Sequence, residues 1–117
     1  MTSIGDPTMR AIEYALDGLS LRSQVTADNI ANARVPGFRP QKVSFEDSLS
    51  RAMGSGRFDG LRRADAQDAG AQVNPDGYAV NIEDEVVEMM KTSLTQDAMI
   101  EAYNFKIGLI QAAVWGR

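Results

Sequence analysis

The sequence contains no cysteine and no histidine among its 117 residues. Without cysteine, the chain can form neither a disulfide nor a thiolate nucleophile. Without histidine as well, it lacks the usual ligand sets for zinc and other transition metals. Serine–histidine and cysteine–histidine catalytic pairs are excluded for the same reason. We therefore expect no metal site and no cofactor, and an enzyme built on this chain would have to rely on carboxylates.

Strong charge of one sign and long apolar runs are also missing. Twelve basic against 16 acidic residues give a net charge of −4, without the basic surface that nucleic-acid binding requires. No run approaches the ~18 apolar residues of a membrane-spanning helix. The first residues include no basic segment followed by an apolar one, so we expect no cleavable secretory signal. The length predicts a single domain over residues 1–117.

A first long helix is predicted over residues 7–34. Asp6 is a suitable N-cap, and Pro7 is favoured at the first helical position. Apolar residues then recur at spacings of three and four, which is typical of a coiled-coil seam whose middle is here polar. This seam consists of Met9, Ile12, Leu16, Leu19, Ser23, Thr26, Ile30 and Ala33.

A second long helix is predicted over residues 81–115. Asn81 is a suitable N-cap, and acidic residues fill the first turn, where the helix dipole favours negative charge. The polar middle of its seam either pairs with that of the first helix and sets the register, or consists of tolerated small polar residues. The seam consists of Ile82, Val86, Met89, Ser93, Gln96, Ile100, Tyr103, Ile107, Ile110 and Val114.

The same helix carries a second apolar stripe. Two stripes indicate a helix that is covered on more than one side. At ~1.5 Å per residue the helix spans roughly 50 Å, whereas a compact chain of this size is only ~35 Å across. We therefore expect an elongated molecule that associates with copies of itself or with relatives. The second stripe consists of Val87, Leu94, Ala98, Ala102, Phe105, Leu109 and Ala112.

Residues 35–80 are rich in glycine and polar residues and predict loops with a small hairpin. The segment 43–50 reads as a short helical turn or a strand, anchored by Phe45 and Leu49. Arg57, Arg62 and Arg63 form a loose basic cluster. This cluster either contacts an acidic neighbour or lipid head groups, or simply lies in a solvated loop.

The junction after the first helix has the most specific pattern. Pro36 stops the helix, and Gly37 can adopt positive φ, so Pro36–Gly37 predicts a type II turn. Asn29 and Asn32 lie on one helix face beside small residues, which lets another backbone approach and bond to the amides. The junction residues are Asn29, Asn32, Pro36, Gly37 and Phe38.

The run from Leu21 to Phe38 resembles the N-terminal signature of the bacterial flagellar axial proteins, which form the rod, hook and hook–filament junction. The family pattern is roughly Ala-x-Asn-Ile-Ala-Asn-Ala-x-Thr-Pro-Gly-Tyr. Val35 replaces the usual Thr and Phe38 the usual Tyr, and neither change disturbs the turn. The short length and the segments 43–46 and 80–86 are similar to those of a short protein of the proximal rod; another short rod protein is the alternative.

The resemblance implies a mainly α fold in which the two long helices pack as a coiled coil. It implies a structural subunit of the proximal rod that assembles helically and transmits torque from the membrane ring to the hook. The implied partners are copies of the chain, other rod proteins, the membrane ring protein, the rod–ring adaptor and the flagellar type III export apparatus. The implied location is the periplasmic rod of the basal body, reached without signal cleavage.

The predicted assembly interface consists of Ile12, Leu16, Leu19, Ile30, Val86, Met89, Ile100, Ile107, Ile110 and Val114. Trp115 is expected to be a packing anchor. Two other classes of protein compete with this interpretation. One is an enzyme that uses the carboxylates at residues 83–85 and 88, although a solvated helix start explains them better. The other is a cytoplasmic coiled-coil adaptor, which the heptad pattern alone allows.

Overall fold

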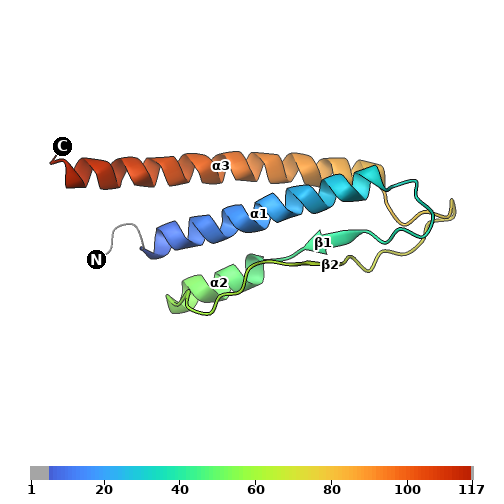
Figure 1. Cartoon of the computed structure of the whole chain (residues 1–117), viewed down its shortest axis with the longest axis horizontal. Helices are drawn as coiled ribbons and strands as arrows, with labels where there is room; N and C mark the ends of the chain where they lie inside the picture. The colour runs from blue at the N-terminus through green and yellow to red at the C-terminus, as the bar shows by residue number, and fades with distance from the viewer. Residues whose placement is uncertain (1–5, 117) are drawn as a thin grey trace.

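The computed structural model describes residues 6–116, which form three helices and a two-stranded sheet (Figure 1). In chain order the elements are α1 (Pro7–Ala31), β1 (Gln41–Val43), α2 (Glu46–Ser55), β2 (Ala66–Asp68) and α3 (Ile82–Val114). The molecule measures 63 × 26 × 16 Å. Its radius of gyration of 17.8 Å exceeds the ~13 Å of a compact domain of about 100 residues. The predicted mainly helical, elongated fold is confirmed.

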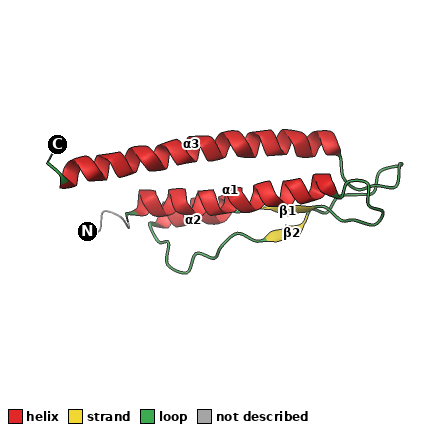
Figure 2. Cartoon of the chain, turned by 45° about the horizontal axis from the view of Figure 1, so that its top comes forward, coloured by secondary structure: helices red, strands yellow, loops and turns green. Residues whose placement is uncertain are grey.

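Helices α1 and α3 run antiparallel along the long axis (Figures 1 and 2). At one end Lys106 Nζ lies 3.2 Å from Asp6 Oδ2, and at the other the Asn29 amide donates to Glu85 Oε1 at 2.9 Å. Because α3 has 33 residues and α1 has 25, the last turns of α3 extend past the start of α1. The expected overhang of a ~50 Å helix is therefore present.

Helix α1 ends at Ala31, three residues before the predicted end at residue 34. Asn32 is the C-cap, and its side-chain amide donates to the Asp28 carbonyl at 2.8 Å. The following residues turn repeatedly because Pro36 disfavours helical conformation in the residue before it. The N–H of Phe38 donates to the Val35 carbonyl at 3.2 Å, with φ of 80° at Gly37. This geometry is the predicted type II turn.

Helix α3 matches its predicted bounds of 81–115 to within one residue at each end. Asn81 is the N-cap, and its side-chain oxygen accepts from the Asp84 N–H at 3.2 Å. Trp115 is the C-cap. The acidic first turn lies where the helix dipole stabilises it.

The middle of the chain is more regular than the predicted loops and hairpin. The ten-residue helix α2 follows Phe45, begins with Glu46 and Asp47, and ends at Gly56 with φ of 71°. Strands β1 and β2 pair antiparallel, with Gln41 opposite Asp68. They are not a hairpin, because α2 lies between them in the sequence. Helix α2 and the ribbon pack on α1 on the side away from α3, which makes α1 the middle layer (Figure 1).

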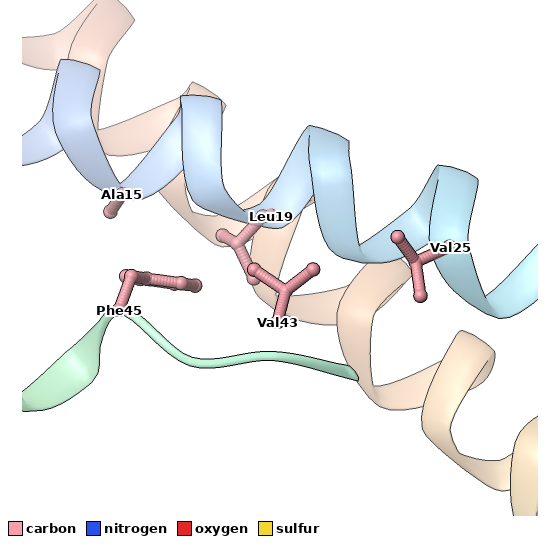
Figure 3. Close-up of a cluster of buried hydrophobic side chains, with 5 residues drawn as sticks. All are labelled: Ala15, Leu19, Val25, Val43 and Phe45. Atoms are coloured by element: carbon pink, nitrogen blue, oxygen red, sulfur yellow. The ribbon is translucent and has the colours of Figure 1, made fainter. Parts of the chain in front are cut away.

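The core joins α1 to this middle segment. Ala15, Leu19 and Val25 of α1 meet Val43 and Phe45, and all five are less than 9% exposed (Figure 3). Burying a large apolar side chain contributes about 1.5–3 kcal/mol. The apolar face of α1 is thus used to hold the ribbon and α2 within the same chain.

Gly18 allows this packing to be close. A Cβ at Gly18 would lie 2.5 Å from Cδ1 of the Phe45 ring, so the ring rests directly on the α1 backbone. Tyr14 meets the same ring edge-on, with ring centroids 6.1 Å apart. The mid-helix glycine is therefore explained by contact with an aromatic ring.

Arg22 holds the start of α2 against α1. Its Nη2 donates to the Val43 carbonyl at 2.6 Å, and Nη1 and Nη2 donate to the Glu46 carboxylate at 2.7 and 2.8 Å. Its guanidinium carbon lies 4.7 Å from the centroid of the Phe45 ring. The hydrogen bonds from Arg22, opposed in part by burial and aided by the N–H groups of Glu46 and Phe45, lower the pKa of Glu46 to about 2. Arg22 thus joins a strand end, a helix start and the core ring.

Replacement of Gly18 by alanine tests the contact with Phe45. Alanine gains ~1 kcal/mol of helix propensity, but displacing the ring is expected to cost more, for a net loss of about 1–2 kcal/mol. Gly54→Ala is the control, because no atom lies within 4 Å of its built Cβ, and it should stabilise by about 0.5–1 kcal/mol. Denaturant unfolding followed by circular dichroism measures both. Stabilisation by Gly18→Ala would contradict the packing described.

The Arg22–Glu46 pair predicts a pH dependence. Because folding lowers the pKa of Glu46 from 4.5 to about 2, its stabilisation is complete above pH 4.5 and is lost as the pH falls towards 2. The Glu46 side chain is 59% exposed, so solvent screening limits the contribution to about 1 kcal/mol. Unfolding of Glu46→Gln should therefore show that loss at pH 7 and almost none at pH 2. Equal losses at both pH values would rule out the pair as the cause.

Candidate assembly surfaces

Asn29 is the centre of the junction between the three layers. It is 1% exposed. Its amide nitrogen donates to the Gln41 carbonyl at 2.8 Å and to Glu85 Oε1 at 2.9 Å, and its oxygen accepts from the Gln41 N–H at 3.0 Å. One side chain therefore links α1, β1 and α3. The backbone that the motif was expected to accommodate is that of the chain itself, just after the turn.

The other junction residues shape the end of the molecule. Asn32 is half-buried and caps α1, Pro36 and Gly37 are exposed in the turn, and Phe38 is half-buried. The loop before α3 folds back on this end, since the guanidinium of Arg34 lies 5.0 Å from the centroid of the Tyr78 ring. The junction and this loop therefore lie together at one end of the α1–α3 pair.

The predicted interface residues separate into those used inside the subunit and those left outside. Ile12 and Leu19 are buried, at 9% and 2% exposure. The half-buried members are Leu16, Ile30, Met89, Ile107 and Ile110. Val86, Ile100 and Val114 remain 42%, 47% and 66% exposed. Packing within one chain therefore accounts for much of the seam predicted from the sequence.

The polar middle of α3 lies one residue away from the predicted position. Ser93 is exposed and Gln96 half-buried, whereas Thr92 is 2% exposed and faces α1, on which Thr26 is 3% exposed. The hydroxyl of Thr92 makes no hydrogen bond among the described residues. The difference arises because α3 is apolar on several sides, so its pattern alone does not define which side faces α1.

An exposed apolar stripe runs along α3 opposite α1. Met90, Leu94 and Phe105 on it are 62%, 70% and 70% exposed. Acidic residues recur on the same face at helical spacing and are also exposed. We call this surface the outer stripe: Glu83, Val87, Met90, Leu94, Asp97, Glu101, Phe105 and Leu109. Exposed apolar side chains gathered on one face in this way are typical of an interaction site. Trp115, expected to be a packing anchor, is 71% exposed beyond it, because the end of α3 passes the start of α1.

A groove also runs along α1 between α3 and the α2 layer. Its end near α2 has a volume of about 410 Å³ and is lined by apolar residues that include Leu49, Met53, Phe58 and Met99. Further along it becomes charged, where Arg22, Glu46 and Glu88 line it. This open surface differs from the enclosed pocket with convergent polar groups that small-molecule sites usually have.

The candidate carboxylates of α3 and the arginines after α2 lie at or near the protein surface. Across residues 6–116 no three carboxylates lie close enough to hold a metal ion. The carboxylates and arginines singled out in the sequence form no ion pair within that range: Glu83, Asp84, Glu88, Arg57, Arg62 and Arg63. Glu88 is half-buried, and the other five are exposed. None of the helices in the described part of the chain combines the length and apolarity needed to cross a bilayer.

Several bacterial proteins are similar in sequence to this chain over most of its length. No family model matches the chain. It is 33% identical to the flagellar basal body rod protein FlgB of Aeromonas hydrophila, over 86% of this chain and 87% of that protein. The chain belongs to the FlgB family of flagellar basal-body rod proteins. It is also 23% identical to FlgB of Bacillus subtilis over 97% of this chain and 98% of that protein, and 28% identical to FlgB of Borreliella burgdorferi over 83% and 91%.

Membership of this family confirms the resemblance inferred from the Leu21–Phe38 run and identifies the chain as a flagellar basal-body rod component. Sequence reasoning overlooked three residues that organise the surfaces: Gly18, Arg22 and Glu85. A glycine inside a strong helical pattern is a signal of close packing, and it could have indicated Gly18. The sequence explains Glu85 by the helix dipole or, in the enzyme alternative, as one of the carboxylates, and its bond to Asn29 has no local sequence signal.

Substitution of Asn29 tests the junction. Asn29→Asp keeps the size but removes both donated hydrogen bonds and places a carboxylate beside Glu85 and the Gln41 carbonyl. A loss of about 3 kcal/mol or more in unfolding free energy is expected, because the new carboxylate would be buried beside Glu85 with the Gln41 N–H as its donor. Asn32→Asp is the control, since it removes one hydrogen bond at an outer helix end and should cost about 1 kcal/mol. Similar losses in both variants would contradict the central role of Asn29.

Proposed function

We propose that the chain is a non-catalytic structural subunit of the proximal rod of the flagellar basal body. Copies assemble helically, with α1 and α3 along the rod axis, and the rod transmits torque from the membrane ring to the hook. The observation that carries this proposal is the outer stripe, an apolar surface left exposed on a ~50 Å helix in a chain of the FlgB family. A helix of this kind requires a neighbour to cover it.

The α1–α3 pair suits an element that resists torque. Contacts between Asp6 and Lys106 at one end and Asn29 and Glu85 at the other connect the two helices over most of the length of α1. The helices extend along the 63 Å axis and leave the outer stripe free along it. Burial of each large apolar side chain contributes about 1.5–3 kcal/mol, so covering the stripe favours assembly over the isolated chain.

The proposed interface is narrower than the set predicted from the sequence. Ile12 and Leu19 serve the subunit core, whereas Val86, Ile100 and Val114 remain exposed and available to a neighbour. Leu16, Ile30, Met89, Ile107 and Ile110 are half-buried and offer a neighbour only part of their surface. The outer stripe therefore becomes the centre of the proposed contact, and the exposed Val86, Ile100 and Val114 lie on the same helix.

The family resemblance supports the remaining parts of the proposal. The chain reaches the periplasmic rod through the flagellar type III export apparatus without signal cleavage. Its neighbours are copies of itself, other rod proteins, the membrane ring protein and the rod–ring adaptor. Similarity to FlgB proteins over most of the chain favours this role over that of another short rod protein such as FlgC or of a cytoplasmic adaptor.

Two carboxylates placed on the outer stripe test the proposed role. Leu94→Asp with Phe105→Asp should leave the helices intact, because both side chains are exposed, yet remove the chain from purified basal bodies and abolish motility. Circular dichroism, immunoblots of basal bodies from the parent bacterium and swimming assays measure these effects. The control is Ser20→Asp with Gln24→Asp, on the exposed polar face of α1, which should be incorporated normally. Normal incorporation of the Leu94/Phe105 variant would refute the proposed interface, and absence of the unaltered chain from basal bodies would refute the function.

A further inference from the structure

The two outer layers of the molecule carry opposite charge. Helix α3 contains six carboxylates and two lysines, whereas residues 48–63, in α2 and the loop after it, contain four arginines and one aspartate. Helix α3 packs on one side of α1, and α2 with its loop packs on the other (Figures 1 and 2). One outward face is therefore acidic and the opposite face basic.

The acidic face is the outer stripe itself. Its carboxylates at Glu83, Asp97 and Glu101 are exposed and form no ion pair in the described part of the chain. They alternate with side chains such as Leu94 and Phe105, each 70% exposed. A partner for this surface must cover apolar side chains and also supply positive charge.

The basic face has that combination. We define it as Arg51, Arg57, Arg62 and Arg63 together with Leu61. All four arginines are exposed and unpaired with any carboxylate among residues 6–116, and Leu61 is half-buried. A shallow hollow of about 380 Å³ lies between Arg51, Arg57 and Arg62, and Leu61 lines it. The loop is anchored to the body, because the Tyr14 hydroxyl donates to the Arg62 carbonyl at 2.9 Å.

The two faces cannot meet within one chain, since α1 lies between them. Pairing of two outer stripes about a two-fold axis would bring like carboxylates together, and such juxtaposition costs several kcal/mol. Contact between the stripe of one copy and the basic face of another brings opposite charges together. Because such a contact uses two different surfaces, it leaves a free face at each end and can repeat.

We propose that the outer stripe of α3 in one copy docks on the basic face of the next copy. This contact rests on the proposed role as a rod subunit and specifies its nearest neighbour as a second copy of this chain. The apolar residues of the stripe lie against Leu61 and the hollow between the arginines. The carboxylates of the stripe pair with the arginines around it.

Paired charge reversal in the full chain tests the contact. The acidic-face variant is Asp97→Lys with Glu101→Lys, and the basic-face variant is Arg57→Glu with Arg62→Glu. Each is expected to lower incorporation into basal bodies of the parent bacterium by at least about tenfold, because like charges then face one another. A chain with all four reversals has complementary faces again and should return to within about twofold of the unaltered chain.

The control is Asp17→Lys with Asp28→Lys, which matches the charge change of the acidic-face variant on an exposed face of α1 and should leave incorporation unchanged. Circular dichroism verifies that each variant keeps its helices. If the fourfold variant is as impaired as the acidic-face variant, the stripe meets another stripe or a different protein, and the proposal is wrong. Unimpaired single-face variants would overturn it as well. In both cases the unaltered chain would still be present in basal bodies, so the proposed function would stand.

Discussion

The hydrogen bonds of Asn29 are the constraint on which the rest of the structure depends. A two-helix coiled coil with apolar residues on several sides can slide or rotate, because many registers bury similar area. The amide of Asn29 removes this freedom by bonding to both backbone groups of Gln41 and to Glu85. Since the Asn29 side chain is buried, any other register leaves its amide unsatisfied, which costs more free energy than a changed apolar contact.

This constraint assigns different tasks to the two long helices. Helix α1 is used inside the subunit: one side faces α3, and the other holds Phe45, Val43 and the start of α2. Gly18 and Arg22 make that second side specific, since Gly18 leaves room for the Phe45 ring and Arg22 binds Glu46. Among the described helices and strands, α3 packs on α1 alone, and its opposite face is exposed. In the proposed rod, α1 therefore organises the subunit and α3 contacts the neighbouring subunit.

The sequence predicted those features that local chemistry determines. Asp6 and Asn81 cap the long helices, and Pro36–Gly37 forms the expected turn. It did not predict which side of α3 faces α1, because that choice depends on the Asn29–Glu85 bond between residues far apart in the chain. For a similar reason the sequence predicts only a short helical turn or a strand where α2 lies. The ten-residue segment has weak helical signals, and its position depends on Phe45 and Arg22. The outer stripe is visible in the sequence as a second periodicity, but only the structure shows that this face, with its carboxylates, is the exposed one.

The distribution of charge has a consequence for how such a subunit avoids closed complexes. An exposed apolar stripe without charge would pair with its own copy, and a two-fold dimer would consume the surface that an extended structure requires. Carboxylates at Asp97 and Glu101, within the stripe, make that pairing unfavourable. In the proposed contact, arginines on the basic face of the next copy supply the opposite charge, so the carboxylates that disfavour the closed dimer favour the repeating contact. In the proposed assembly, the acidic residues of the stripe thus select an open association over a closed one, and the apolar residues between them contribute free energy of burial.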